Sequence, residues 1–259
     1  MSSVDSYVQG APCWIDLVTT DVDSARTFYS GLFGWSYDDY PMPGSAGEMT
    51  YYMSTIDGRN VAGLMQQAPE MVGDAPSWQT YIAVDDAEAA AERVAEEGGT
   101  VLFPVDEIPG SGRMTIAFDT AGAKFGLWQT IGHIGSAVVN QHGAPIWHEL
   151  QAPDPAAAAA FYSAVMGVEP KTADVGGIPY TELFASGKSS AGIMPKQDAD
   201  QPSMWLVYLG ADNPDETAAR AAELGGTVLQ PAFDIPGIGR MAVLADPQGV
   251  VFAVMRGES

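Results

Sequence analysis

The chain has 259 residues, of which 46% are hydrophobic, and its 33 acidic and 11 basic side chains give a formal net charge of −22. This composition excludes disorder as the main state, and the length allows two domains with their own cores. The charge predicts repulsion of nucleic acid and of anionic membranes, so neither is expected as a partner. No apolar run approaches the roughly 20 residues that span a bilayer, and the start MSSVDSYVQG does not resemble a secretion signal, so we expect a cytoplasmic protein.

In chain order, the first half of the sequence alternates short apolar runs with two amphipathic segments. The segments that follow Asp21 and Asp86 predict helices, because an Asp at this position caps a helix N-terminus. Gly98 is expected to end the second helix, and residues 119–122 have the residue order of a type I turn. Runs rich in β-branched and aromatic residues predict strands at 14–19, 50–56, 60–66, 80–84, 100–103, 114–118 and 124–128.

The second half of the chain repeats the first. The segment that contains Trp14 and Asp16 recurs 133 residues later with Trp147 and Glu149, and residues 98–102 recur 127 residues later as 225–229. The six residues lost between these anchors are expected in the stretch 41–66. A repeat of this length indicates two homologous domains, which we expect at residues 1–131 and 132–259.

Each half divides again into two units of one strand, one helix and three strands. Helix caps occur twice in each half, and in the second half Asp154 and Asn213 are each followed by proline at the first helical position. Four βαβββ units predict an α+β fold with two tandem domains, each a curved mixed sheet with outer helices.

Two motifs resemble those of a known family. The helix pattern Asp-x-x-x-Ala-x-x-Phe-Tyr-x-x-x-x-Gly occurs at 21–34 and 154–167, and an Asp-x-x-Gly turn precedes the closing strand of each half. Together with the βαβββ order, these motifs resemble the vicinal oxygen chelate superfamily, which includes glyoxalase I, extradiol dioxygenases and the bleomycin-resistance proteins. The tandem layout is similar to that of the two-domain actinobacterial glyoxalase-like proteins, among them the mycobacterial 27 kDa antigen. The resemblance covers nearly the whole chain and implies two glyoxalase-like domains.

The resemblance also implies a cup in each domain and, in the metal-bearing members, four His, Glu or Gln ligands to one divalent ion. Aligned on the two motifs, the ligand positions fall on Trp14, Gly63, Gln79 and Gly126 in the first domain and on Trp147, Gly192, Leu206 and Ala253 in the second. Only Gln79 carries a donor atom, and one amide does not hold a transition ion that takes three or four ligands. We therefore predict no metal and no other cofactor. Cys13, the only cysteine, excludes a Cys-cluster site.

Strand alternation predicts which side chains line the cups. The expected ligand-binding residues are mainly aromatic: Trp14, Gln79, Tyr81, Trp128, Trp147 and Tyr208. Asp16 and Glu149 stand at the same place in the two domains and are the candidate catalytic residues, since a carboxylate in an apolar cup can act as a general base. Each could instead anchor a ligand or serve the structure alone.

Basic groups offer fewer candidates. Arg113 and Arg240 recur across the halves and are candidates to bind an anionic ligand, with a structural tie to a nearby acid as the alternative. Of the three histidines, His133 and His142 lie by the interdomain connector, and His148 is expected to face the helices as a buried, hydrogen-bonded side chain.

Three hypotheses follow. The first is a metal-free, glyoxalase-like or bleomycin-resistance-like protein that binds a small, partly aromatic or apolar molecule in its cups. The second is an enzyme, a lyase, isomerase or oxygenase, whose metal ligands have moved to Asp16, Glu149 or Gln79 or whose carboxylates act as bases. The third is a partner-binding protein with vestigial cups. Because four units on one chain can form two cups unaided, a monomer is expected to suffice, with a homodimer as the alternative.

Overall fold

The computed structural model describes residues 2–42, 49–68 and 75–258. Within them the chain forms four α-helices, namely α1 (Val22–Phe33), α2 (Ala87–Glu96), α3 (Pro155–Met166) and α4 (Pro214–Glu223). None of the helices in these ranges is long and apolar enough to cross a membrane.

The strands form two large mixed sheets. The first has the order β3 (Ser36–Met42), β4 (Met49–Ile56), β5 (Arg59–Gln66), β2 (Pro12–Thr19), β6 (Ser77–Ala83), β10 (Lys124–Thr130), β9 (Gly112–Phe118) and β7 (Thr100–Val101), with β8 (Asp106–Ile108) paired to β9. The second has the order β13 (Glu169–Val175), β14 (Ile178–Ala185), β15 (Lys188–Pro195), β12 (Pro145–Ala152), β16 (Met204–Gly210), β19 (Val251–Gly257), β18 (Gly239–Ala245) and β17 (Thr227–Ile235). A short pair, β1 (Ser2–Ser3) with β11 (Val138–Val139), ties the N-terminal segment to the connector.

Each sheet has an antiparallel pair at its centre and a parallel strand on either side. In the first sheet β2 runs antiparallel to β6, and β5 and β10 run parallel to β2 and β6 respectively. The second sheet repeats this arrangement with β12, β16, β15 and β19. These are the two tandem domains predicted from the repeat, hereafter domain 1 and domain 2.

The helices begin where the sequence predicts them. Asp21 and Asp86 each accept a hydrogen bond at 3.0 Å from a backbone N–H of the first turn, and Asp154 accepts two at 3.1 Å. Such caps satisfy donors that have no partner inside the helix. Gly98 has φ of +83° and follows Glu97, the C-cap of α2, so it occupies the left-handed position one residue beyond the cap.

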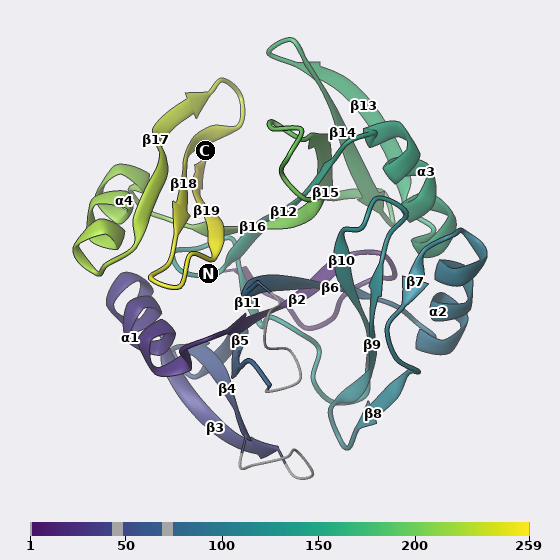
Figure 1. Cartoon of the computed structure of the whole chain (residues 1–259), viewed down its shortest axis with the longest axis horizontal. Coiled ribbons are helices and arrows are strands. Elements are labelled where there is room, and N and C mark those ends of the chain that lie inside the picture. The colour runs from purple at the N-terminus through teal and green to yellow at the C-terminus, as the bar shows by residue number, and fades with distance from the viewer. Residues whose placement is uncertain (1, 43–48, 69–74, 259) are drawn as a thin grey trace.

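Helices lie on the convex face of each sheet, and the two convex faces meet in the middle of the molecule. Figure 1 shows α1 beside α4 and α2 beside α3. One core therefore combines Phe28 and Tyr29 of α1 with Phe252 of β19, whose ring lies 6.2 Å from that of Phe28. The other core combines Phe125 of β10 with Phe161 and Tyr162 of α3. Each core thus contains residues of both domains.

The Phe-Tyr motif and the Asp-x-x-Gly turn contact each other across the domains. Tyr29 donates its hydroxyl to Asp246 in the turn of domain 2 at 3.3 Å, and Tyr162 donates to Asp119 in the turn of domain 1 at 3.2 Å. Each turn aspartate also accepts backbone N–H groups of its own turn. The two motifs therefore hold the domains together.

The predicted position of the six residues that the second half lacks was wrong in part. Strands β3 and β13 start at 36 and 169, an offset of 133, whereas β4 and β14 start at 49 and 178, an offset of 129. Strands β6 and β16 start at 77 and 204, an offset of 127. Four of the six residues are thus lost between β3 and β4 and two between β5 and β6, beyond the stretch 41–66.

Candidate functional site

The concave face of the second sheet encloses a cavity of about 1040 Å³. A volume of this order is typical of pockets that bury a small organic ligand. Its walls are formed mainly by apolar and aromatic side chains, which include Trp147, Met194, Met204, Leu206, Phe233, Met241, Val243 and Met255. We call this cavity the domain 2 cup.

A cluster of polar groups lies on the sheet wall of this cup. Tyr208 donates a hydrogen bond to Oε1 of Glu149 at 2.9 Å, and Trp147 Nε1 donates to the hydroxyl oxygen of Tyr180 at 2.7 Å. Glu149 is only 5% exposed, although it lines the cavity. Four side chains from β12, β14 and β16 thus place one carboxyl and two phenols against an apolar space.

The backbone leaves room for this cluster at one glycine. In the strand register, Gly192 of β15 lies between Glu149 of β12 and Glu182 of β14. A Cβ at position 192 would overlap the hydroxyl of Tyr180, so the absence of a side chain there allows Tyr180 to reach Glu149 and Trp147. The Tyr180 hydroxyl occupies the space that a metal-ligating side chain at position 192 would need.

Burial sets the protonation of the cluster. Desolvation raises the pKa of Glu149 above its ordinary value, and hydrogen bonds from Tyr208 and Tyr180 offset part of that rise. Desolvation and the neighbouring carboxylate raise the pKa of Tyr208, so this phenol keeps its proton and acts as a donor. The arrangement can donate or accept hydrogen bonds at the inner wall of an apolar cup.

Domain 1 has a corresponding cluster with tighter internal bonding. Trp14 Nε1 donates to Asp16 Oδ1 at 2.7 Å and lies 2.9 Å from the Tyr51 hydroxyl, which donates to the same carboxylate oxygen at 2.5 Å. Burial raises the pKa of Asp16, while hydrogen bonds from Tyr51, Trp14 and Tyr81 lower it in part. A Cβ at Gly63 would overlap both Tyr51 and Asp16. Asp16 is therefore held by its own neighbours.

Three other candidates also lie on the concave face of domain 1. Gln79 is the register partner of Asp16 and is 3% exposed, and its Oε1 has no hydrogen-bond partner. Trp128 packs with Trp14 and Tyr81 and donates to the carbonyl of His133 at 2.8 Å. The imidazole of His133 contacts the edge of Trp14 at 4.5 Å between centroids, and burial lowers its pKa to about 4.

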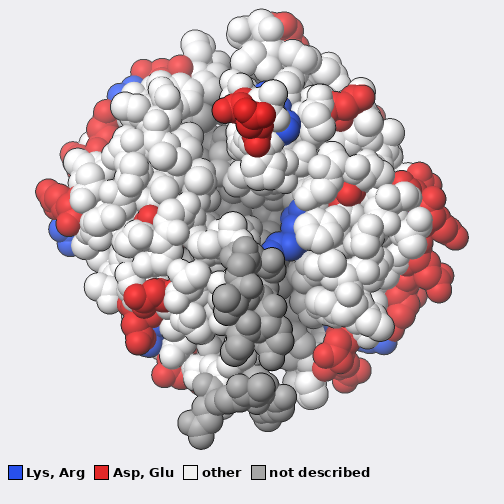
Figure 2. All heavy atoms as spheres, viewed as in Figure 1, with Lys and Arg blue, Asp and Glu red and all other residues white. Residues whose placement is uncertain are grey.

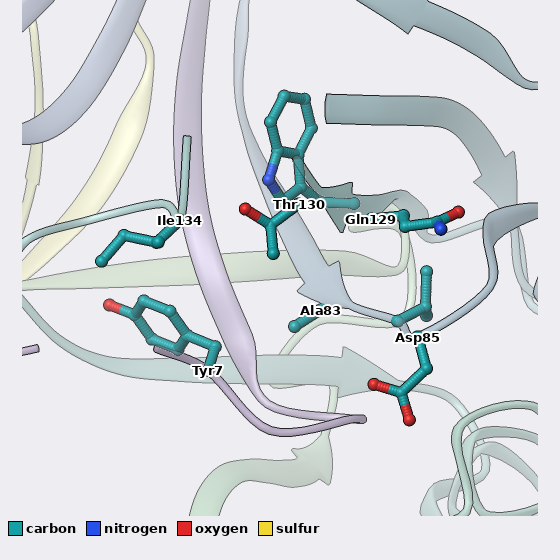
Figure 3. Close-up of a pocket in the computed structure, with 8 residues that line it drawn as sticks. Tyr7, Ala83, Asp85, Gln129, Thr130 and Ile134 are labelled. Atoms are coloured by element: carbon teal, nitrogen blue, oxygen red, sulfur yellow. The ribbon is translucent and has the colours of Figure 1, made fainter. Parts of the chain in front are cut away.

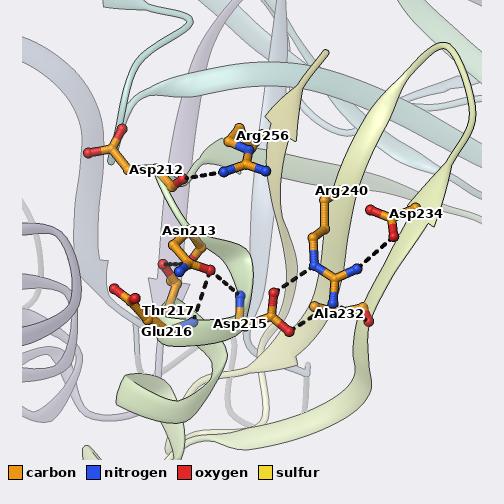
Figure 4. A network of polar contacts seen from close by, with 9 residues as sticks. All are labelled: Asp212, Asn213, Asp215, Glu216, Thr217, Ala232, Asp234, Arg240 and Arg256. Atoms are coloured by element: carbon orange, nitrogen blue, oxygen red, sulfur yellow. Dashed lines mark hydrogen bonds and ion pairs between the residues drawn. The ribbon is translucent and has the colours of Figure 1, made fainter.

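The two arginines lie on the opposite side of the sheets from the cups. Arg113 of β9 pairs with Glu88 of α2, and Arg240 of β18 donates to Asp215 of α4 and to Asp234 of β17 (Figure 4). Their strand neighbours Met114 and Met241 face the cups instead. Because alternate residues of a strand face opposite ways, both arginines point away from the cups, and their pairing with acids corresponds to the structural tie that the sequence analysis gave as the alternative.

Buried groups on the helix side agree with the predicted alternation. His148 faces the helices and meets Thr80 Oγ1 at 3.3 Å, and burial lowers its pKa to about 4. Cys13 packs instead with Trp14, Tyr81 and Trp128, and burial raises its thiol pKa, so it is not an activated nucleophile.

The residues at the family's metal positions do not fit a metal ion. Both first-strand positions carry tryptophans whose indole N–H donates to a neighbour, and an indole N–H offers no lone pair. At two further positions, Gly63 and Gly192, tyrosine hydroxyls fill the space. Within residues 2–42, 49–68 and 75–258 no three His, Cys, Asp or Glu side chains gather in a way that could hold a metal ion.

A smaller cavity of about 200 Å³ lies beside domain 1, between the N-terminal segment and the ends of β6 and β10. Figure 3 shows Tyr7, Asp85, Thr130 and Ile134 around it. Its volume is below the roughly 300 Å³ at which ligand pockets usually begin, so we do not take it as the site.

Sequence reasoning missed Tyr51, Tyr180 and Glu182. The two tyrosines are equivalent residues at an offset of 129, and both lie on strands that were assigned no cup residue. Their repetition together with Gly63 and Gly192 was the available signal.

The chain matches known families over both domains. Residues 12–127 match the Glyoxalase/Bleomycin resistance protein/Dioxygenase superfamily, and residues 147–255 match the glyoxalase-like domain family. The protein belongs to the Glyoxalase/Bleomycin resistance protein/Dioxygenase superfamily, which confirms the resemblance found in the sequence.

Relatives cover the chain from end to end. The Mycobacterium bovis protein named "Putative glyoxylase CFP32" is 44% identical over 260 residues, which are 99% of this chain and 98% of that protein. The Streptomyces peucetius protein named "Anthracycline biosynthesis protein DnrV" is 32% identical over 263 residues, 96% of this chain and 94% of the other.

Solved structures of low identity show the same fold. The Mn(II)-bound glyoxalase from Novosphingobium aromaticivorans has a TM-score of 0.65 at 16% identity, covering 96% of this chain and 82% of the other. The 2,3-dioxygenase LapB from Pseudomonas sp. KL28 has a TM-score of 0.66 at 15% identity, covering 97% and 93%.

Proposed function

We propose that the protein binds a small organic molecule with an apolar or aromatic body in the domain 2 cup, without a metal ion. The observation that carries this proposal is the cavity of about 1040 Å³ with one polar cluster on an otherwise apolar wall. Apolar walls supply affinity through burial, and a few placed polar groups orient the ligand. The sequence predicted a ligand in each cup, and we restrict the proposal to the cup whose cavity the described residues enclose.

The shape and chemistry of the wall suit a flat ring system. Trp147 and Phe233 offer aromatic faces, and four methionines offer flexible, polarisable contacts that adapt to an irregular outline. The relative named for anthracycline biosynthesis supports a polycyclic aromatic body, and the relative named as a glyoxylase supports a small carbonyl compound. The cavity has the volume for the larger of these ligands.

Polar recognition is assigned to Glu149, Tyr180 and Tyr208. Tyr208 and Glu149 are already paired, so a ligand oxygen or N–H at the inner wall would join an existing hydrogen-bond network at low ordering cost. Trp147, whose indole N–H is used by Tyr180, has its ring faces left for stacking.

The test is a fluorescence titration with N-phenylnaphthylamine, a neutral apolar probe, on the wild type and two matched variants. Val243→Trp fills the domain 2 cup, and Ile116→Trp places the same bulk at the equivalent position on the concave face of domain 1. We expect the first variant to lose at least tenfold in affinity and the second to retain it. Equal losses, or no binding by the wild type, would refute the proposal.

A second candidate is proton-transfer catalysis at the same place, because Glu149 has a raised pKa and two phenols beside it. Such a group could remove a proton next to a ligand carbonyl while a phenol hydrogen bonds the oxygen that gains charge. Glu149→Gln should then abolish solvent-deuterium exchange of a bound carbonyl ligand and leave its affinity within about threefold. Exchange that survives in the variant would exclude this role.

The remaining expectations concern partners. We propose that the partner is a small molecule rather than nucleic acid or membrane, which the acidic side chains around the visible face support (Figure 2). Each cup is formed by one chain, so a monomer suffices for binding, and sedimentation velocity would distinguish it from a homodimer. The alternative is a partner-binding protein with vestigial cups. The titration above would favour it if the wild type did not bind the probe.

A further inference from the structure

The ionisable side chains that line the domain 2 cup are acidic, which bears on the charge of the ligand that it can bind. Glu149 and Glu182 both line the cavity and lie on the same side of the sheet, one on either side of Gly192 in the strand register. Among the described residues that line this cavity, none is Lys, Arg or His. The site itself is defined by the apolar cavity, and the two acids place carboxyl groups on one of its walls.

Glu182 differs from Glu149 in its surroundings. It is half-buried on β14, and the hydroxyl of Ser189 on β15 donates to its Oε2. A neutral hydroxyl orients the carboxylate without neutralising it. The carboxylate of Glu182 therefore faces the cavity with its charge available.

Two lysines of the same sheet region, Lys171 and Lys196, contact other groups. Lys171 is the register partner of Glu182 on β13, but its Nζ lies 3.6 Å from the carboxylate of Glu169 and 4.2 Å from the centre of the Phe184 ring. Lys196 donates its ammonium to the carbonyl oxygens of Ala199 and Gln201. Neither lysine lines the cavity, so the charge of Glu182 is not balanced inside the cup.

Domain 1 lacks this second acid. Met53 takes the position of Glu182, since it is the register partner of Gly63 as Glu182 is of Gly192. The single carboxylate of that cluster, Asp16, already accepts hydrogen bonds from Trp14 and Tyr51. Glu182 is thus a specific feature of domain 2 and not a requirement of the fold.

Resting on the proposed function, we propose that the ligand of the domain 2 cup is an apolar or aromatic molecule that carries a protonated amine, and that Glu182 binds this amine. An ammonium at this wall would donate a charge-assisted hydrogen bond to the carboxylate of Glu182, while its ring system contacts Trp147 and the methionines that line the cup. A ligand with a carboxylate or phosphate in this position would meet the like charge of Glu182, and the cup would reject it.

The experiment compares three probes with the same ring body and different charge: pyrenylmethylammonium, pyrenylmethanol and pyrenylacetate. Dissociation constants are measured by fluorescence for the wild type, for Glu182→Gln and for Glu216→Gln. Glu216 is exposed on α4, away from the cup, so Glu216→Gln changes the net charge of the protein by the same amount as Glu182→Gln. The control therefore separates a local contact from the general attraction of cations to an acidic protein.

We expect the wild type and Glu216→Gln to bind the ammonium probe about tenfold more tightly than the alcohol, and the acid most weakly. Glu182→Gln should bind the alcohol as the wild type does and lose the preference for the ammonium. Equal affinities for the three probes, tightest binding of the acid, or a preference that survives in Glu182→Gln would overturn the inference and leave the proposed function intact. Failure of all three probes to bind would overturn the proposed function and the inference with it.

Discussion

The two cups have the same framework and differ in how their carboxylates are used. In domain 1, Asp16 accepts from Trp14 and Tyr51 at 2.7 and 2.5 Å, so the cluster satisfies itself. In domain 2 the tryptophan donates to Tyr180 instead, and Glu149 keeps Tyr208 as its close donor. Domain 2 has a carboxyl one methylene longer at the position of Asp16 and an acid at the position of Met53, and both acids line the cavity. Equivalent positions in duplicated domains can therefore differ in their hydrogen-bond partners while the framework stays the same.

Removing the carboxyl of Asp16 or of Glu149 should give the largest difference between the domains in the free energy of unfolding. Asp16→Ala leaves the buried donors of Trp14 and Tyr51 without their acceptor, which we expect to lower the free energy of unfolding by about 3 kcal/mol. Glu149→Ala removes the acceptor of Tyr208 beside an open cavity that water can enter, and should cost about 1 kcal/mol. Urea unfolding monitored by circular dichroism measures both. A larger cost at Glu149 would reverse the comparison.

Replacing the residue that differs between the cups should remove the charge preference of domain 2. Glu182→Met gives domain 2 the residue that domain 1 carries, and should abolish the roughly tenfold preference for an ammonium probe, about 1.4 kcal/mol. Met53→Glu in the same chain should not restore that preference in domain 2. Titration of the single and double variants with the charged and neutral pyrenyl probes checks this, and a preference unchanged by Glu182→Met would show that the difference between the cups lies elsewhere.

The pH dependence of stability should show that both carboxyls resist ionisation. Burial raises the pKa of Asp16 above 3.8 and that of Glu149 above 4.5, so the neutral forms contribute stability that is complete below those values. As the pH rises, the unfolded chain releases its protons first, and stability falls until the pH passes the pKa of each folded group, by at most about 1.4 kcal/mol per pH unit and group.

Asp16→Asn and Glu149→Gln should each flatten this fall. The measurement is the free energy of unfolding of the wild type minus that of each variant between pH 4 and pH 8. If this difference rose with pH, the carboxyls would be ionised in the folded protein, and the sign of both pKa shifts would be wrong.

The smallest expected contrast lies at the helix caps. Asp154 accepts two N–H groups at 3.1 Å and precedes a proline, whereas Asp21 accepts one at 3.0 Å. Replacing either residue by Ala should cost about 1 kcal/mol, and slightly more at Asp154. Thermal unfolding of the two variants measures this, and a cap that costs nothing would mean that tertiary packing alone fixes that helix.

The repeat and the caps made most of the fold predictable. An Asp before an apolar-periodic segment has a local physical meaning, and its recurrence at Asp21, Asp86 and Asp154 located three helices directly. Strands β3 and β13 were not located by residue, because they are polar edge strands whose side chains are mostly exposed and show no clear alternation. Their place followed only from the order of the βαβββ unit.

The candidate site was predictable only in part. Trp147, Glu149 and Tyr208 could be placed in the cup because alternation along β12 and β16 fixes the face of each residue. Tyr180 and Glu182 depend on pairing between β14 and β15, which spacing along the chain does not specify. Arg113 and Arg240 were candidates by their rarity, but the partner that decides their role lies on a helix 25 residues away in sequence.

The reciprocal contacts of Tyr29 with Asp246 and of Tyr162 with Asp119 bear on how the chain can be divided. Each repeat contributes part of the residues of both cores, and neither core is complete without the other repeat. A fragment cut at the connector would carry one complete cup but two half-cores with their apolar faces exposed, and only the other fragment offers the matching halves. The unit that folds is consequently the pair of repeats. Two copies of a single repeat would have to associate before the apolar face behind either sheet was buried.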